Sequence, residues 1–268
     1  MAASLKSHAK IIISRGFKES ASYVWSPFVT KLEARLRFSG VPYSVDSGGP
    51  RQAPRGKIPY VTVTAGDQDP FTLSDSTLIV SELVKDGTLD DLNANLSATQ
   101  QAQDLAIRAL LEDKLNFYHT YERWHENYYT MRSHVLAPLP YPMRVIIGML
   151  AYRGNMRTIY GQGTGRFSGE EIAAFRAEIW ETLNGMLVES RQKRLSNAGD
   201  KPFWILGDER PTEADAVLFG YISSVLVCKA APSSRKVVRN LAAVVDYAQR
   251  IHYAYFPDYD LWEQWEQR

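Results

Sequence analysis

The sequence predicts an α/β domain followed by an all-helical domain. Strand and helix patterns alternate over the first 87 residues, and strand patterns are absent from residue 97 onward. A chain of 268 residues is long enough for two modest domains, each with its own core. We therefore assign residues 1–87 to the α/β domain, 88–96 to a linker and 97–268 to the helical domain.

The first domain begins with a strand pattern at 9–17, followed by a helix pattern at 26–40. The apolar residues of this helix recur at helical spacing, with its charged residues on the other face. Ser26 is placed as its N-cap, with Pro27 in the first turn. The later elements are strands at 42–46, 60–64 and 71–73 and a helix at 75–86. This order predicts a small mixed sheet with helices packed on it.

The second domain opens with a long helical pattern that Ser97 caps and that a proline-rich stretch at 137–142 interrupts. Further helices are expected at 169–190, 212–227 and 240–252. Thr212 and Asp215 have the spacing of a capping box at the third of these helices, which is a folding device. The glycine-rich run at 161–166 follows no strand, so we interpret it as a turn between helices and not as a phosphate loop.

Composition excludes several functional classes. A formal charge of +1 argues against a nucleic-acid partner, which would require a basic surface. The single cysteine, Cys228, excludes an internal disulfide framework and is expected to be buried and inert. No run approaches 18 apolar residues, so no membrane segment is expected and the protein is expected to be cytoplasmic. We also expect no metal site.

The stretch "GKIPYVTV" at 56–63 places a proline at the mouth of a strand. Pro59 cannot donate a ladder hydrogen bond, so it is tolerated there as a plain strand edge. Alternatively, a cis bond before Pro59 would turn the backbone of Ile58 toward a ligand. The local sequence leaves both interpretations open.

Seven stretches, taken together and in order, resemble the glutathione S-transferase superfamily, in particular its failed-axon-connections and metaxin-like branch. They are "SPFVTKLEARLRFSGVPY", "PRGKIPYV", "LSDSTLIVSEL", "LLEDKLNFYHTYERW", "GQGTGRFSGEEI", "DKPFWILGDERPTEADAVLFGYISSVL" and "NLAAVVDYAQRI". The resemblance covers nearly the whole chain. It implies a thioredoxin-like N-terminal domain that binds glutathione and an all-helical C-terminal domain that binds a second substrate.

The resemblance implies a glutathione site at three places. Pro59 would be cis and would direct the backbone of Ile58 toward the cysteinyl part of glutathione. Asp75 and Ser76 would meet the γ-glutamyl end at a helix N-terminus, where unpaired amides attract carboxylates. The same two residues also suit a simple helix cap, and the two roles are compatible. Lys57 would reach a glutathione carboxylate, although it also suits a solvated loop.

Catalysis in this superfamily requires stabilisation of a thiolate, which helix N-termini and nearby donors favour. Ser26 is the first candidate donor, Tyr23 the second and Ser22 the third. A serine before proline is also a good N-cap, which would occupy the hydroxyl of Ser26. The absence of cysteine from this stretch argues against thiol-exchange chemistry.

The long helical pattern from residue 98 carries aromatic residues at helical spacing, namely Phe117, Tyr121, Trp124 and Tyr128. Such a stripe is more often core than pocket. Because a second stripe runs beside it, we interpret part of this segment as the wall of an apolar substrate site.

The leading hypothesis is a glutathione S-transferase acting on a bulky apolar electrophile, a small-molecule partner. The first alternative is a glutathione-dependent trans/cis double-bond isomerase, as found in secondary metabolism. The second is a non-catalytic binding module of the same fold, or a metaxin-like module. The resemblance also allows a homodimer.

Overall fold

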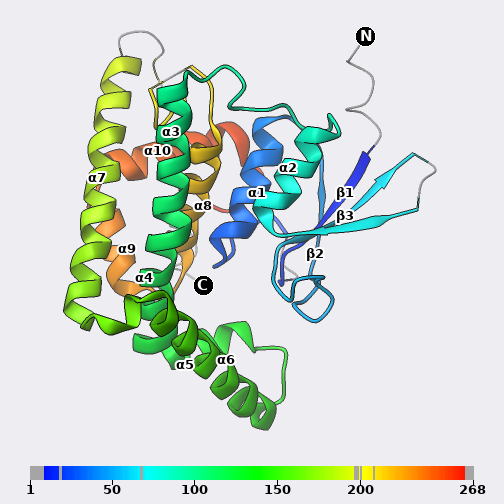
Figure 1. The fold of residues 1–268 in the computed structure, drawn as a ribbon, viewed down its shortest axis with the longest axis vertical. Coiled ribbons are helices and arrows are strands. Elements are labelled where there is room, and N and C mark those ends of the chain that lie inside the picture. Colours follow the sequence, from blue (N-terminus) through cyan, green and yellow to red (C-terminus); the bar gives the residue numbers. More distant parts are fainter. Residues whose placement is uncertain are drawn as a thin grey trace.

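The computed structural model describes residues 9–17, 20–66, 69–195, 199, 201–207 and 209–262. A sheet with two helices packed on it lies on one side, and a larger set of helices lies on the other (Figure 1). This arrangement confirms the predicted α/β plus all-α fold class.

Four strands form the sheet, in the order β2-β1-β3-β4. They are β1 (Ala9–Ser14), β2 (Ser44–Asp46), β3 (Tyr60–Ala65) and β4 (Phe71–Ser74). β1 pairs in parallel with β2 and antiparallel with β3, which pairs antiparallel with β4. In this register Tyr60 is opposite both Ser14 and Ser74. The end of β1, the start of β3 and the end of β4 therefore meet at one edge of the sheet.

Helices α1 (Pro27–Phe38) and α2 (Ser76–Lys85) pack on this sheet. The shared core consists of β-branched and leucine side chains, including Ile11, Ile13, Leu32, Leu36, Val61, Val63, Ile79 and Leu83. The linker region contributes to the same core, because Leu89 is only 2% exposed.

The charged side of α1 does not face solvent. Lys31, Glu33 and Arg35 are all buried, because the helical domain covers the side of α1 that the sheet leaves open. Each of these three side chains makes an ion pair with a residue outside α1. An amphipathic pattern indicates that one face of a helix is apolar. It does not indicate whether another domain covers the charged face.

The helical domain contains more elements than the sequence predicts. They are α3 (Ala98–Ala109), η1 (Leu110–Leu115), α4 (Asn116–Tyr121), η2 (Glu122–Glu126), α5 (Tyr128–Val135), α6 (Tyr141–Gln162), η3 (Thr164–Arg166), α7 (Gly169–Leu195), α8 (Glu213–Val227), α9 (Pro232–Arg239) and α10 (Ala242–Tyr255). Sequence patterns missed α6 and α9, and each has a proline in its first turn.

The long helix after Ser97 contains two π-helical turns, η1 and η2. The Asn127 amide donates to the carbonyl of Glu122 at 3.0 Å, five residues earlier. Each π turn shifts the following residues around the helix axis relative to regular α spacing. Aromatic residues on either side of η2 therefore do not continue one α-helical stripe.

Three local predictions are confirmed in the helical domain. The carboxylate of Asp215 accepts hydrogen bonds from the amide of Thr212 at 2.8 Å and from its hydroxyl at 3.1 Å. The run at 161–166 turns the chain between α6 and α7, with Gly163 at a positive φ of 108°. Cys228 is a buried free thiol at the end of α8, and burial raises its pKa.

The two domains meet where α1 crosses the buried core helix α8. A Cβ atom added at Gly220 of α8 would lie 2.5 Å from the carbonyl oxygen of Pro27 and 2.8 Å from the amide of Lys31. Both atoms are backbone atoms of α1, so no side-chain movement can relieve the overlap. Glycine at this position is what allows the two helices to approach so closely.

We predict that Gly220→Ala destabilises the protein by about 1–3 kcal/mol, because it forces the α1 and α8 backbones apart. The matched control is Gly185→Ala in α7, where an added Cβ would have no atom within 4 Å. That change should be neutral or stabilising by up to about 1 kcal/mol, since alanine is the better helix former. Urea unfolding of both variants tests the prediction, and equal stability changes would contradict it.

Candidate functional site

The sheet edge at Ser14, Tyr60 and Ser74 carries the first part of the candidate site. The Ile58–Pro59 bond, immediately before β3, is cis, as the resemblance implies. The side chain of Ile58 packs against the chain that leaves β1, because a Cβ at Gly16 would lie 2.7 Å from its Cδ1. Within the described ranges, the amide and carbonyl of Ile58 make no hydrogen bond.

The N-terminus of α2 follows β4 at the same edge. Asp75 has a positive φ of 78°, and its carboxylate accepts from the amides of Thr77 at 3.0 Å and Leu78 at 3.3 Å. Asp75 is therefore the N-cap of α2, and these two bonds offset the strain of its backbone.

Two serine hydroxyls flank Asp75 without a partner among the residues that the structure describes. Ser76 is only 5% exposed, and the hydroxyl of Ser74 is buried. Buried polar groups are nearly always hydrogen-bonded, and the buried hydroxyl of Ser74 has no such partner. A polar ligand at the N-terminus of α2 would supply one. Lys57, by contrast, is exposed on the preceding loop.

A buried lysine connects this helix end to the helical domain. The ammonium of Lys31 donates to the hydroxyl of Thr77 at 2.8 Å and to the carboxylate of Glu112 at 2.6 Å. These three residues belong to α1, α2 and η1. The position of the α2 N-terminus thus depends on contacts in both domains.

Ser26 lies at the N-cap position of α1, but its side chain accepts no hydrogen bond from the helix. The interpretation of its hydroxyl as a cap is therefore wrong. Pro27 takes the first position of α1 and has no amide to cap. Ser26 is half-buried, and its hydroxyl is left available at the positive end of α1.

The side chains of Tyr23 and Ser22 do not lie at the N-terminus of α1 beside Ser26. The hydroxyl of Tyr23 lies 2.8 Å from Nδ1 of His252, and burial raises its pKa far above the usual value. Four aromatic rings surround Tyr23, those of Phe219, Phe256, Tyr259 and Trp262. Ser22 is buried, and its carbonyl accepts from Arg15. Of the three candidate donors, only Ser26 has both an available hydroxyl and a helix N-terminus.

An aromatic stack that the sequence analysis missed lies next to Ser26. The ring of His134 stacks on Trp25 with centroids 3.6 Å apart, and on Phe17 with centroids 5.0 Å apart. The guanidinium of Arg123 donates to the Trp25 carbonyl at 2.9 Å. The stack joins α5 to the loop between β1 and α1. No sequence spacing signals it, because His134 is far along the chain from Phe17 and Trp25.

The four aromatic residues predicted as substrate wall are all half-buried. The ring of Tyr128 lies against Tyr152 of α6, with centroids 5.3 Å apart, and that of Tyr121 against His125, with centroids 4.7 Å apart. Tyr121 also packs on the helical core. Phe117 and Trp124 complete this set. The assignment of these side chains to a substrate wall stays a prediction.

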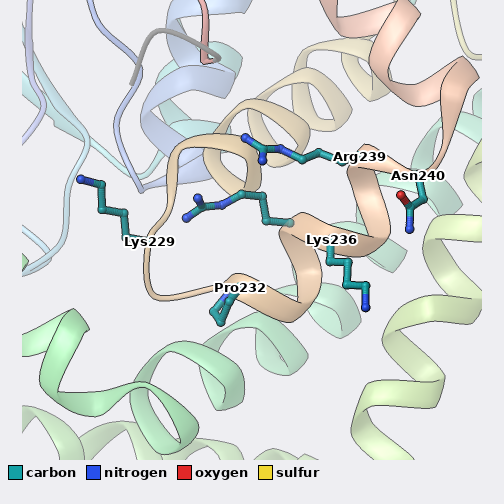
Figure 2. Close-up of a pocket in the computed structure, with 6 residues that line it drawn as sticks. Lys229, Pro232, Lys236, Arg239 and Asn240 are labelled. Atoms are coloured by element: carbon teal, nitrogen blue, oxygen red, sulfur yellow. The ribbon is translucent and has the colours of Figure 1, made fainter. Parts of the chain in front are cut away.

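A separate cavity of about 620 Å³ lies at α9 (Figure 2). Its lining is mostly cationic and consists of Lys229, Pro232, Arg235, Lys236, Arg239 and Asn240. Lys229 and Lys236 extend in different directions around it (Figure 2). No residue of the sheet-edge site contributes to this lining.

Comparison with known proteins finds matches to both domains of the glutathione S-transferase fold. Residues 27–131 match the model of a glutathione S-transferase N-terminal domain, and residues 189–251 match the model of a glutathione S-transferase C-terminal domain. The chain is 30% identical to the isoprene-epoxide–glutathione S-transferase of Rhodococcus sp. (strain AD45) over 239 residues, which cover 86% of this chain and 92% of that one.

Two further similarities are more distant. Human metaxin-1 is 27% identical over 226 residues, covering 82% of this chain and 46% of metaxin-1. A glutathione transferase family member from Pseudomonas fluorescens, solved with two glutathione bound, has a TM-score of 0.52 at 15% identity, covering 94% of this chain and 91% of that chain. The latter likeness shows the shared fold.

We predict energetic coupling across the domain interface through Lys31 and Glu112. In a double-mutant cycle of Lys31→Met and Glu112→Gln, the coupling free energy should be about 1–3 kcal/mol, because the pair is largely shielded from water. The control pair is Lys85 and Glu82, which is 3.7 Å apart and 77% and 53% exposed. Its coupling should be about 0.5 kcal/mol or less. Equal coupling free energies in the two cycles would contradict this prediction.

Proposed function

Because the chain belongs to the glutathione S-transferase superfamily, we propose that it is a glutathione transferase that joins glutathione to an apolar electrophile. The observation that carries this proposal is the convergence at one sheet edge of an unpaired Ile58 backbone with the unpaired hydroxyls of Ser74 and Ser76. These groups fit a ligand that has both a peptide backbone and a carboxylate.

In this proposal the amide and carbonyl of Ile58 form main-chain hydrogen bonds with the cysteinyl backbone of glutathione, as an extended segment does with a bound peptide. The hydroxyl and the backbone amide of Ser76 bind the γ-glutamyl carboxylate. Asp75 keeps its capping bonds and adds negative charge near the γ-glutamyl ammonium. Lys57 is exposed and supplies a cation for the glycyl carboxylate.

Ser26 is the donor that we assign to the glutathione sulfur. Its hydroxyl is not used for capping, and it lies at the positive end of α1. Both features favour the thiolate over the thiol, which lowers the pKa of the bound sulfur. The burial of Tyr23 and Ser22 supports the choice of Ser26 over both of them.

The electrophile binds beside the stack of Phe17, His134 and Trp25, which provides an aromatic surface next to Ser26. Half-buried Tyr121 and Trp124 extend that surface in this proposal. The similarity to a transferase named for an isoprene epoxide makes apolar epoxides the first class to test. A carbon–sulfur bond then forms while a ring carbon–oxygen bond breaks, and the ring oxygen takes a proton from water.

A non-catalytic binding module is the second candidate, and the similarity to metaxin-1 favours it. The two candidates differ in a measurable way. A transferase consumes glutathione and epoxide to form a stable thioether, which mass spectrometry detects. A binding module of this fold gives no thioether, even where titration calorimetry detects glutathione binding. Rotation of a double bond with recovery of free glutathione would instead indicate the isomerase alternative.

We predict that Ser76→Ala weakens glutathione binding by about 1.5–3 kcal/mol, the usual value of a hydrogen bond to a charged group. The matched control is Ser81→Ala, a change at an exposed position of the same helix. Titration calorimetry should show a Kd raised tenfold or more, as about 1.4 kcal/mol corresponds to tenfold. An unchanged Kd in both variants would remove this helix end from the site.

Replacing Ser26 tests thiolate stabilisation separately from stability. Ser26→Ala should raise the pKa of bound glutathione, as followed by ultraviolet absorbance. It should change the free energy of unfolding by less than about 0.5 kcal/mol, because the side chain makes no capping bond.

Ser97→Ala is the stability control for this experiment. The hydroxyl of Ser97 accepts from the amide of Gln100 at 3.3 Å, so its loss should cost about 1 kcal/mol and leave the sulfur titration unchanged. A Ser26→Ala variant with an unshifted titration would show that this hydroxyl does not act on the sulfur.

A further inference from the structure

Helices α5 and α6 form a hairpin that projects from the rest of the helical domain (Figure 1). Its outer surface carries large apolar side chains in contact with solvent. Tyr141 is 69% exposed, Ile146 64% and Leu150 62%, with Met143, Val145 and Met149 also exposed. Exposed apolar side chains that gather on one helix usually mark an interaction surface.

The formally charged residues in and around the hairpin are all positive. Residues 127–169 contain five arginines and no aspartate or glutamate, in a chain whose formal net charge is only +1. Two of these arginines, Arg153 and Arg157, are exposed on α6. They follow Ile146 and Leu150 at helical spacing and therefore lie on the same face. The surface that contacts this face must tolerate apolar side chains and carry negative charge.

Arg144, one of these five arginines, holds the loop between α5 and α6 in place. The guanidinium of Arg144 donates to the carbonyl of Leu139 at 2.6 Å and to that of Ala137 at 2.7 Å. Three prolines, at 138, 140 and 142, limit the loop backbone further. The exposed apolar residues at the start of α6 are thus presented by an ordered tip.

We propose that the α5–α6 hairpin docks onto an anionic lipid surface. In that arrangement the apolar side chains enter the boundary of the acyl chains, and the arginines contact the lipid phosphates. A second copy of the chain is the less favourable occupant, because both copies would bring arginines to the interface and residues 127–169 contain no aspartate or glutamate to pair with them. The proposal concerns surface attachment and does not depend on glutathione binding.

Attachment by the hairpin is distinct from membrane spanning. Over the described part of the chain, no single helix has the length and apolar composition to cross a bilayer. The bent pair of α8 and α9 passes by length and composition, but α8 is buried in the core of the helical domain.

Vesicle flotation tests this proposal with the full-length protein. The wild type should float with vesicles of phosphatidylcholine mixed with phosphatidylserine, and it should float weakly with phosphatidylcholine alone. Ile146→Glu combined with Leu150→Glu should reduce the bound fraction at least about tenfold, because it removes apolar insertion and adds like charge to the lipid. Circular dichroism melts establish that each variant is folded.

The matched control is Leu105→Glu, which changes a 59% exposed leucine of α3 outside the hairpin. It should float as the wild type does. Absence of wild-type binding to anionic vesicles, or equal binding by the double variant, would overturn the proposal. A wild-type dimer in analytical ultracentrifugation that the double variant converts to monomer, without any vesicle binding, would instead assign the face to a second copy.

Discussion

The burial of α1 between the sheet and α8 is the constraint on which the rest of the structure depends. The helices can approach this closely only because Gly220 has no side chain at the crossing. Once α1 is covered on both sides, each charge that it carries requires a partner. Glu33, for example, accepts from the hydroxyl of Tyr259 at 3.0 Å and lies 3.5 Å from Arg15, although its burial still raises its pKa.

The candidate site is a consequence of that packing. Lys31 of α1 connects α2 to η1, so the α2 N-terminus and the start of α1 are fixed relative to each other. The sheet register brings the cis bond before β3 to the same edge. The stack on Trp25 then attaches α5 to the loop beside Ser26. Both domains therefore contribute to the surroundings of the proposed sulfur position.

Much of the fold could be predicted from sequence because short-range patterns determine it. Runs of β-branched residues identified the strands, and the resemblance to the glutathione S-transferase superfamily implied the cis bond before Pro59. Sequence could not show that Tyr23 is enclosed by rings from the distant C-terminal segment, or that Ser26 leaves its capping role unused. The π turns were not predicted from sequence, because α-helical spacing was assumed throughout. Helix α6 was not predicted either, because its exposed apolar face lacks the usual amphipathic pattern.

The central claim is that glutathione binds at the sheet edge and not in the cationic cavity at α9. Nuclear magnetic resonance of the labelled protein tests it most directly, by following backbone amide shifts during titration with glutathione. We expect saturable shifts at the amides of Ile58, Ser76 and Thr77, with little change at Lys229 and Lys236. Shifts confined to the α9 cavity, or no saturable shift at the sheet edge, would contradict it.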